Sequence, residues 1–434
     1  MPQSDPAAPD PADPLSVRHL RSGLGTRSLR GGAVTMLAQA AKTLLQFASV
    51  AVLARLLAPE AFGLVAMVAV VMILLEQFKD LGLSTATVQR EEITHGQVSG
   101  LFWMNAGLGL AAAAVACALA PAVAAFYGHP ELVQITLWLA LGFVISGLGT
   151  QHVALLRRQM RFKTLAGVQL AAEVVGLGAA VIAALSGADY WSLVIQRLGW
   201  TLALTGGAWL TCRWRPGAPR RHQGLRSLLG YGGNITGANL INFATRNLDM
   251  VLIGWWWGSV SLGLYERSTK LLMTPLNNLN TPLFAVAMPT LSRLAGEPAA
   301  YRRAYLQLLE KLVMITTPCA AILVVEPDAV VRLLFGPDWS AAAPIVGWLG
   351  VAALYQPATY TCSWLFMSQD RSRDMLHWGM IGSTMTAISI VAAVPFGPVA
   401  VAASYSLSGL LVRLPALFWM VGRRGPVSMA DLYR

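Results

Sequence analysis

Charged residues are scarce in this chain: Asp, Glu, Lys and Arg make up 12% of its 434 residues, whereas hydrophobic residues make up 55%. An ordinary soluble domain carries roughly 25% charged residues. A disordered protein would be more polar, and a soluble enzyme of ordinary build would carry more charge. The composition therefore predicts a polytopic membrane protein.

Features typical of catalytic and metal-binding proteins are also missing. The four cysteines are single and far apart, so neither a disulfide framework nor a metal site is indicated. The chain has six histidines, no HExxH motif and no GxxxxGK[ST] phosphate-binding loop. We therefore expect no bound metal, no cofactor and no enzymatic activity.

Apolar runs of about 20 residues, the length of a membrane-crossing helix, begin after Arg30. The runs are too long for strands and lack period-two alternation, so an all-α integral membrane fold is predicted. Twelve spans are predicted, at residues 32–54, 61–79, 98–120, 133–153, 165–185, 190–211, 230–256, 261–286, 307–325, 341–364, 376–394 and 398–420.

The positions of the basic residues predict the orientation of these spans. The chain has 32 Lys and Arg against 21 Asp and Glu, a net charge of +11. No basic run is interleaved with aromatic residues, so nucleic acid is not an expected partner. If the N-terminus is cytoplasmic, 23 of the basic residues fall in cytoplasmic segments, and only Arg55 and Arg332 fall in outside loops. Cytoplasmic loops attract Lys and Arg, so both termini are predicted to be cytoplasmic.

A basic stretch divides the chain near its middle, with six predicted spans on each side. Two six-helix bundles around a central cavity are a common transporter architecture. We therefore expect a disordered cytoplasmic tail at 1–30, an N-terminal bundle at 31–211, a basic cytoplasmic linker at 212–229, a C-terminal bundle at 230–422 and a cytoplasmic tail at 423–434.

Polar residues form a stripe along the seventh predicted span. Asn239, Asn242, Arg246 and Asp249 occur at i, i+3, i+7 and i+10, so they share a helical sector about 80° wide. The stripe can act as interhelical hydrogen-bond glue, with Arg246 paired to Asp249. It can also line a hydrophilic cavity, which we favour because glue seldom needs two charged groups.

Other ionisable residues lie in the predicted spans, where burial is costly and such groups usually face a bundle interior. Glu266, Lys270 and Asn277 share one face of the eighth span. A cavity lined by the basic residues Lys42, Arg246, Arg267 and Lys270 would suit an anionic head group such as a phosphate. Three further basic residues are interpreted as side chains that reach a membrane surface: Arg197, Lys311 and Arg413.

Several segments in fixed order resemble the polysaccharide transporter family, the oligosaccharide flippases of the multidrug/oligosaccharidyl-lipid/polysaccharide exporter superfamily. The resemblance covers roughly residues 25–422, and its most specific part lies around Asn247, Asp249, Gly254, Gly263, Tyr265 and Pro275. The segments that carry it are LARLLAPEAFGLVAM (53–67), DLGLSTATVQRE (80–91), LLRRQMRFK (155–163), NLDMVLIGWWWGSVSLGLYERSTKLLMTPLNNL (247–279), PTLSRL (289–294) and LLFGPDWSAAAPIVGWL (333–349).

The resemblance implies a flippase that moves an undecaprenyl-diphosphate-linked oligosaccharide across the bacterial inner membrane for exopolysaccharide, capsule or O-antigen biosynthesis. The implied partners are this lipid-linked oligosaccharide, membrane lipids, and a polysaccharide polymerase with its export machinery. A proton or sodium gradient would drive transport. The predicted substrate-binding residues are Lys42, Asn239, Asn242, Arg246, Arg267, Lys270 and Asn277, and the predicted ion-coupling residues are Asp249 and Glu266, followed by Glu76 and Glu173.

Two alternatives stay open. An ion-coupled small-molecule (multidrug) antiporter would share the fold, although the basic tilt of the intramembrane charges is unfavourable for a cationic drug. A membrane glycan polymerase or ligase usually carries a sizeable external loop, whereas the longest outside loop expected here is residues 325–340. Many family members continue for two more spans, so a lipid-tail groove built from those helices is not expected in this chain.

Overall fold

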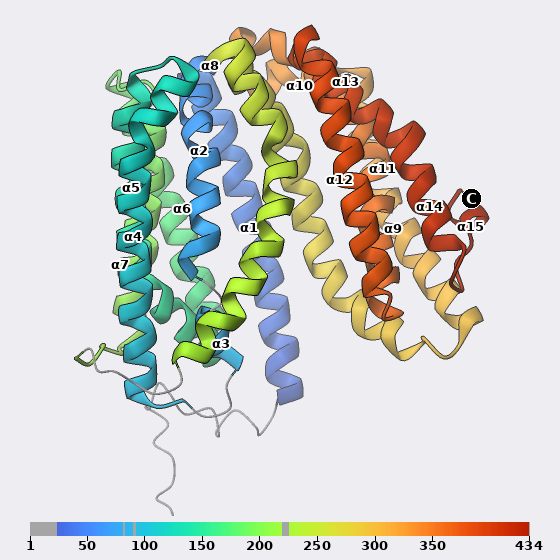
Figure 1. The fold of residues 1–434 in the computed structure, drawn as a ribbon, viewed down its shortest axis with the longest axis horizontal. Helices are drawn as coiled ribbons and strands as arrows, with labels where there is room; N and C mark the ends of the chain where they lie inside the picture. Colours follow the sequence, from blue (N-terminus) through green and yellow to red (C-terminus); the bar gives the residue numbers. More distant parts are fainter. Residues whose placement is uncertain (1–23, 81–82, 90–92, 219–224, 434) are drawn as a thin grey trace, which may run out of the picture. The chain divides into compact units, whose positions relative to one another are not determined.

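A computed structural model describes the backbone of residues 24–80, 83–89, 93–218 and 225–433. Within these ranges, the side chains of residues 24–38, 80, 86, 89, 225–245, 281 and 282 lie outside the description. The regular structure of the described residues is entirely helical (Figure 1). Its first half contains α1 (Leu24–Leu56), α2 (Pro59–Asp80), the short α3 (Leu83–Gln89), α4 (His95–Tyr127), α5 (Glu131–Arg158), α6 (Phe162–Leu185) and α7 (Trp191–Cys212).

The second half begins with α8 (Leu225–Arg293), in which Gly258 alone has non-helical backbone angles and separates two helical segments. Gly258 has φ 78° and ψ −174°, a conformation open to glycine but not to L side chains. The remaining helices are α9 (Pro298–Val325), α10 (Pro327–Leu334), η2 (Pro337–Ala342), α11 (Ala343–Ser368), α12 (Ser372–Ala393), η3 (Val394–Phe396), α13 (Pro398–Ser408), the π-helical turn η4 (Gly409–Arg413), α14 (Leu414–Gly422) and α15 (Met429–Tyr433).

Eight helical stretches of the described chain are long and apolar enough to cross a bilayer, so the protein is a multi-pass membrane protein. They coincide with eight of the twelve predicted spans. Helices also cover the other four predictions, in α1, α7 and both segments of α8, but these do not meet the same standard of length and apolarity within the described residues. The all-helical fold is confirmed, and the count of twelve stays a prediction.

The chain forms two compact units. Unit 1 comprises residues 1–49 and 68–241, and unit 2 comprises residues 50–67 and 242–434. The end of α1 and the start of α2 therefore pack with the second half of the chain, whereas the predicted bundle boundary lies in the 212–229 linker. Hydropathy identifies spans but not the helices they pack against, so the bundle boundaries of the sequence analysis stay a prediction.

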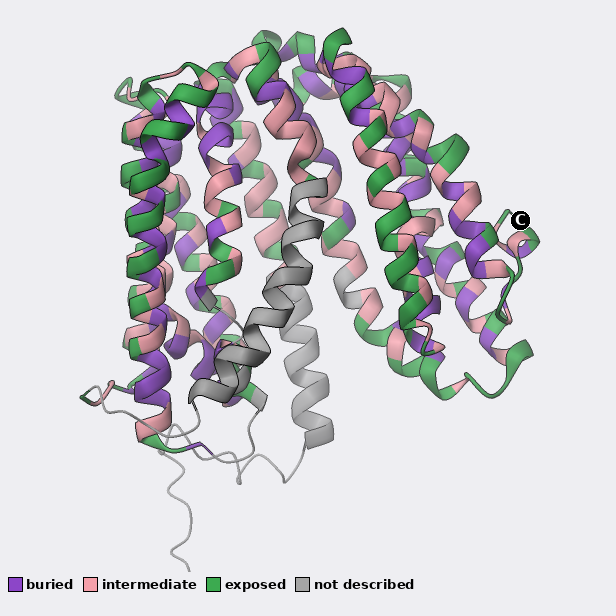
Figure 2. Cartoon of the chain, in the orientation of Figure 1, coloured by how far each residue is buried: buried purple, intermediate pink, exposed green. Residues whose placement is uncertain are grey.

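In unit 1, α4 packs along α5, α5 packs along α7, and α7 packs along α6 (Figure 1). Buried and exposed residues alternate along α4 and α5, as expected of helices with one face on protein and the other on lipid (Figure 2). Phe102 is buried in the core of this unit, and it contacts Trp103, Trp209 and Trp214 edge-on.

In unit 2, α9 packs against α11, which also packs against α13. Trp339 of η2 is fully buried and donates a hydrogen bond of 2.7 Å to the carbonyl oxygen of Ala54 in α1. The backbones of α2 and α8 lie close together at Gly63, where an added Cβ would overlap the backbone of Ser259. These contacts explain why residues 50–67 belong to this unit.

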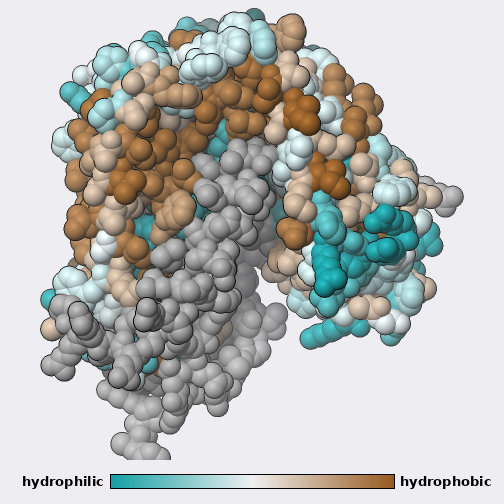
Figure 3. All heavy atoms as spheres, in the orientation of Figure 1, coloured by the Kyte–Doolittle hydropathy of each residue, from teal (hydrophilic) through white to brown (hydrophobic). Residues whose placement is uncertain are grey.

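The surface is largely apolar along the helices (Figure 3). Large exposed apolar side chains would be a liability in water, whereas in a bilayer they contact lipid. The most exposed of them include Leu44, Ile182, Leu185, Leu210, Ile388 and Leu411. Hydrophilic residues gather at the end of unit 2 that holds the first turn of α12 and the C-terminus (Figure 3).

The described parts of the predicted linker and of the predicted C-terminal tail both make specific contacts. Residues 213–218 pack on unit 1, because Trp214 is buried and the Gly217 amide donates to the Ser99 hydroxyl at 2.9 Å. α8 already begins at Leu225, inside the predicted linker. In the tail, α15 is held by an ion pair between Asp431 and Arg302 of α9. The predicted tail at 1–30 lies largely outside the described residues.

Candidate functional site

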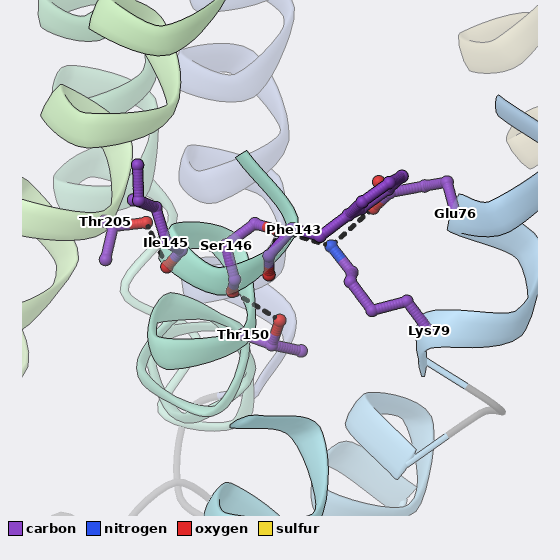
Figure 4. Close-up of polar contacts among 7 residues, drawn as sticks. All are labelled: Glu76, Lys79, Phe143, Ile145, Ser146, Thr150 and Thr205. Atoms are coloured by element: carbon purple, nitrogen blue, oxygen red, sulfur yellow. Dashed lines mark hydrogen bonds and ion pairs between the residues drawn. The ribbon is translucent and has the colours of Figure 1, made fainter. Parts of the chain in front are cut away.

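A buried lysine joins α2 to α5 in unit 1. Lys79 is 5% exposed, and its ammonium group lies between the Glu76 carboxylate, at 2.5 Å, and the Ser146 hydroxyl, at 2.7 Å (Figure 4). Lys79 is the last residue of the predicted span at 61–79 and lies in the last turn of α2. Glu76, a predicted ion-coupling residue, is therefore already paired with a cation, and 46% of its side chain is exposed.

A polar stripe runs along α1 with the spacing that the sequence analysis found only on the seventh span. Gln39, Lys42, Gln46 and Ser49 occur at i, i+3, i+7 and i+10, and so share one helical sector. The structure places this stripe against α6 and α7. Carboxamides are much less conspicuous than charges in an apolar run, which is why the sequence analysis identified only Lys42.

Two hydrogen bonds connect the α1 stripe to its neighbours. The Gln46 amide donates to the Glu173 carboxylate of α6 at 3.5 Å, a long and weak bond. The Gln196 amide of α7 donates to the Ser49 hydroxyl at 2.8 Å. Glu173 therefore has a neutral amide partner, and it forms no ion pair with any residue whose side chain is described.

Lys42 lines a small pocket of about 70 Å³ in unit 1. Polar side chains of Gln39 and Gln169 share the pocket with apolar side chains from the start of α6, which include Phe162 and Leu165. The volume is sufficient for several water molecules. Lys42 has no carboxylate partner among the described side chains, so its charge is available to a ligand or to water.

The polar stripe of the seventh span is only partly described. Asn239 and Asn242 lie outside the residues whose side chains are described. Arg246 is exposed, and Asn277, further along α8, is exposed as well. Arg246 and Asp249 form no ion pair with each other, which removes the pairing that the glue interpretation required.

Asp249 is instead hydrogen-bonded to neutral groups. Its carboxylate accepts from the Tyr265 hydroxyl at 2.9 Å and from the Met250 amide at 2.9 Å. Tyr265 is 1% exposed and Asp249 is half-buried. A carboxylate with neutral partners can take up a proton without breaking an ion pair.

Glu266 has the opposite environment, because two cations surround it. Its carboxylate lies 3.0 Å from Nε of Arg267 and also pairs with Lys270. The Arg267 guanidinium lies over the ring of Phe62, 4.1 Å from the ring centroid. This cluster is a structural ion-pair network with a net charge of +1, and it leaves Arg267 little freedom to contact a substrate.

The structure thus separates the predicted site residues into groups. Arg267, Lys270 and Glu266 lie together in one network, and Glu76 lies with Lys79. Lys42 and Arg246 have no carboxylate partner within the described part of the chain. No group of three or more His, Cys, Asp or Glu side chains is placed to hold a metal ion among the residues described.

The helices and the polar groups inside them define a multi-pass α-helical membrane protein of the transporter type. Residues 52–344 match the polysaccharide biosynthesis protein family, and the chain belongs to this family. The resemblance noted in the sequence is therefore confirmed.

Characterised relatives are similar at low identity. The teichuronic acid biosynthesis protein TuaB of Bacillus subtilis is 26% identical over 73% of this chain and 66% of its own length. The lipopolysaccharide biosynthesis protein WzxC of Escherichia coli is 25% identical over 84% of this chain and 74% of its own. The succinoglycan biosynthesis transport protein ExoT of Rhizobium meliloti is 25% identical over 87% of this chain and 73% of its own.

Solved structures share the fold. The lipid II flippase MurJ in an inward closed conformation superposes with a TM-score of 0.73, at 13% identity, over 93% of this chain and 89% of MurJ. An inward-facing multidrug resistance MATE transporter superposes with a TM-score of 0.69, at 14% identity, over 93% of this chain and 99% of the transporter. These similarities establish the fold and leave the substrate to be argued from the site.

Proposed function

We propose that this protein is a flippase that moves an undecaprenyl-diphosphate-linked oligosaccharide across the bacterial inner membrane, from the cytoplasmic leaflet to the outer leaflet. It is a transporter and not an enzyme. The oligosaccharide serves the synthesis of an exopolysaccharide, a capsule or an O-antigen, and a polymerase with export machinery receives it. The twelve-span topology with both termini in the cytoplasm belongs to this proposal.

The carrying observation is the presence of two cations without carboxylate partners among the described residues, Lys42 on α1 and Arg246 on α8, both of which lie in predicted spans. A cation in a membrane helix is costly unless it meets an anion or water. A diphosphate offers such an anion, and guanidinium and ammonium groups are its usual partners in proteins. The carboxamides beside Lys42, on Gln39 and Gln169, add hydrogen-bonding groups suited to sugar hydroxyls.

Asp249 is the carboxylate best placed to couple transport to an ion gradient. Its hydrogen bonds come from Tyr265 and a backbone amide, whereas Glu266 is held by Arg267 and Lys270. Protonation of Glu266 would break two ion pairs, and protonation of Asp249 would break none. Glu173, with its amide partner Gln46, is the second candidate.

Depletion of the protein in its own host tests the proposal. Lipid-linked oligosaccharide is expected to accumulate on the cytoplasmic side of the inner membrane, and the polymer is expected to disappear from the cell surface. A plasmid copy should reverse both effects, and a copy that carries Lys42→Gln together with Arg246→Gln should not. Unchanged lipid-linked oligosaccharide after depletion would contradict the proposal.

The multidrug antiporter alternative predicts a different phenotype. Depletion would then raise the sensitivity of the cells to cationic drugs and leave the surface polymer unchanged. Glu266 favours the flippase, because it is neutralised by Arg267 and Lys270 and so offers no free negative charge to a cationic drug.

A further inference from the structure

Arg413 lies deep in a membrane-spanning stretch. The helical stretch from Pro398 to Gly422 crosses the bilayer, and Arg413 lies nine residues before its end. At 1.5 Å per residue this is about 14 Å from the nearer end of the helix. The sequence analysis interpreted Arg413 as a side chain that reaches a membrane surface, and the contacts of its guanidinium show that this interpretation is wrong.

The helix opens into a π-helical turn at this arginine, over Gly409–Arg413. Pro415 follows immediately, and it cannot donate the hydrogen bond that Leu411 would accept in a regular α-helix. Gly409 makes room within the turn, because an added Cβ would meet both the Tyr355 hydroxyl and the Arg413 guanidinium. Single π-helical turns occur frequently at functional sites.

The guanidinium is held by neutral groups only. It donates to the Thr386 hydroxyl of α12 at 2.7 Å and to the carbonyl oxygen of Tyr405 at 2.5 Å, and it lies over the Tyr405 ring at 4.6 Å from the centroid. No carboxylate forms an ion pair with it within the described part of the chain, and its buried Nε has no hydrogen-bond partner there. A positive charge is thus fixed in this helical stretch without an ion-pair partner among the described residues, and the closest carboxylate influence is that of Asp249 on the neighbouring Tyr405.

Further donors surround this charge. The Gln356 amide of α11 donates to the Tyr405 hydroxyl at 2.8 Å, and the Tyr355 hydroxyl donates to the Tyr405 carbonyl oxygen at 3.4 Å. The Tyr405 hydroxyl therefore has its own proton free to donate to a ligand. Arg413 and Tyr405 are half-buried, so part of each side chain remains accessible, although Nε of Arg413 is buried.

We propose that Arg413 and the Tyr405 hydroxyl form an anion site in unit 2 that binds a phosphate of the substrate's diphosphate group. This inference rests on the proposed function for the identity of the anion. Its chemical basis is independent, because a fixed guanidinium with a free N–H and a neighbouring hydroxyl donor matches the geometry of a phosphate. Arg413 is thus a substrate-binding residue in addition to Lys42 and Arg246.

Binding to the purified full-length protein in phosphatidylcholine nanodiscs tests the inference, with farnesyl diphosphate as the probe and farnesol as its uncharged counterpart. Wild-type protein is expected to prefer the diphosphate. Arg413→Gln is expected to weaken diphosphate binding about tenfold or more, because a hydrogen-bonded charge is lost, and to leave farnesol binding unchanged. Arg423→Gln is the matched control, since it removes the same charge from the exposed end of the same helix. It is expected to bind like wild type.

Each other result has a distinct meaning. If Arg413→Gln keeps the full preference for the diphosphate, the anion site is elsewhere and the flippase proposal stands. If wild type shows no preference for the diphosphate over farnesol, the diphosphate substrate itself is contradicted.

If Arg413→Gln fails to fold, Arg413→Lys is measured in its place, because it retains the charge but not the planar guanidinium. An unchanged affinity of that variant for the diphosphate would overturn the inference. If added phosphatidylglycerol displaces farnesyl diphosphate from wild type and leaves farnesol bound, the site is assigned to membrane lipid and the substrate assignment is wrong.

Discussion

The carboxylate of Asp249 accepts a hydrogen bond of 2.9 Å from the hydroxyl of Tyr265, sixteen residues further along α8. Arg246, one helical turn before Asp249, is exposed and forms no ion pair with it. The carboxylate is therefore held by neutral groups within α8. This arrangement suits a group that changes its charge during transport.

Replacement of Asp249 tests its role in ion coupling. We expect Asp249→Asn to keep the fold and the hydrogen bond with Tyr265, and to reduce gradient-driven transport to below about a tenth of the wild-type rate. Transport in vesicles with and without an imposed ion gradient measures this effect. Equal stimulation of wild type and Asp249→Asn by the gradient would assign the coupling to another carboxylate, of which Glu173 is the next to examine.

Glu266 should affect stability more than coupling. Glu266→Gln leaves the half-buried Arg267 and the exposed Lys270 without their counter-charge. Loss of one partner of a fully buried pair costs about 3–5 kcal/mol, so a smaller loss is expected for this partly exposed network. Thermal unfolding of the detergent-solubilised protein should show a clear decrease in midpoint. Glu310→Gln, at an exposed glutamate of α9, should leave the midpoint close to wild type. A wild-type midpoint in Glu266→Gln would mean that the network does not stabilise unit 2.

Much of this architecture could be predicted from the sequence, because hydropathy reports directly on the medium that surrounds a helix. The helices and eight of the spans were predicted in this way. The partners of individual charges could not be, since they depend on which helices pack together. Lys79 ends a predicted span, but its contact with Ser146 of α5 could not be predicted. Arg413 was assigned to a membrane surface, although a π-helical turn and Thr386 fix it within the helix.

In the candidate site, too, the spacing of polar residues could be predicted, but their partners could not. The spacing of the polar residues on the seventh span was visible in the sequence because two of them are charged: Asn239, Asn242, Arg246 and Asp249. The stripe on α1 has the same spacing but a single charge: Gln39, Lys42, Gln46 and Ser49. It was recognised only from its hydrogen bonds with α6 and α7. Asn239 and Asn242 lie outside the described side chains, so their predicted contact with substrate stays a prediction.

Close helix packing in unit 2 depends on Gly63. An added Cβ would overlap the backbone of Ser259, and overpacking of this kind costs about 1–3 kcal/mol. We therefore expect Gly63→Ala to lower the unfolding midpoint. Gly107→Ala in α4 is the matched control, because no atom lies within 4 Å of the added Cβ. Equal midpoints for the two variants would show that α2 and α8 do not pack at this glycine.

The C-terminal helix should loosen at low pH. Hydrogen bonds from Arg302 and from Ser428 lower the pKa of Asp431 from its ordinary value of 3.8 to about 2. Because the folded-state pKa is lowered, the stabilisation is complete above pH 3.8 and is lost as the pH falls through about 2. Hydrogen exchange of residues 425–433 should therefore accelerate across this range, and Asp431→Asn should show fast exchange already at neutral pH. Slow exchange in Asp431→Asn would show that this ion pair does not hold α15.

Leaflet transfer in proteoliposomes tests the central claim most directly. Vesicles are made with an undecaprenyl-diphosphate-linked oligosaccharide in both leaflets, and a membrane-impermeant reagent that modifies sugars is added outside. With wild-type protein and an ion gradient, the account predicts that molecules of the inner leaflet also react, as they emerge on the outside. With Lys42→Gln and Arg246→Gln combined, only the molecules that begin in the outer leaflet should react. If only the outer-leaflet molecules react in vesicles that contain wild-type protein, the protein does not flip this lipid and the account is contradicted.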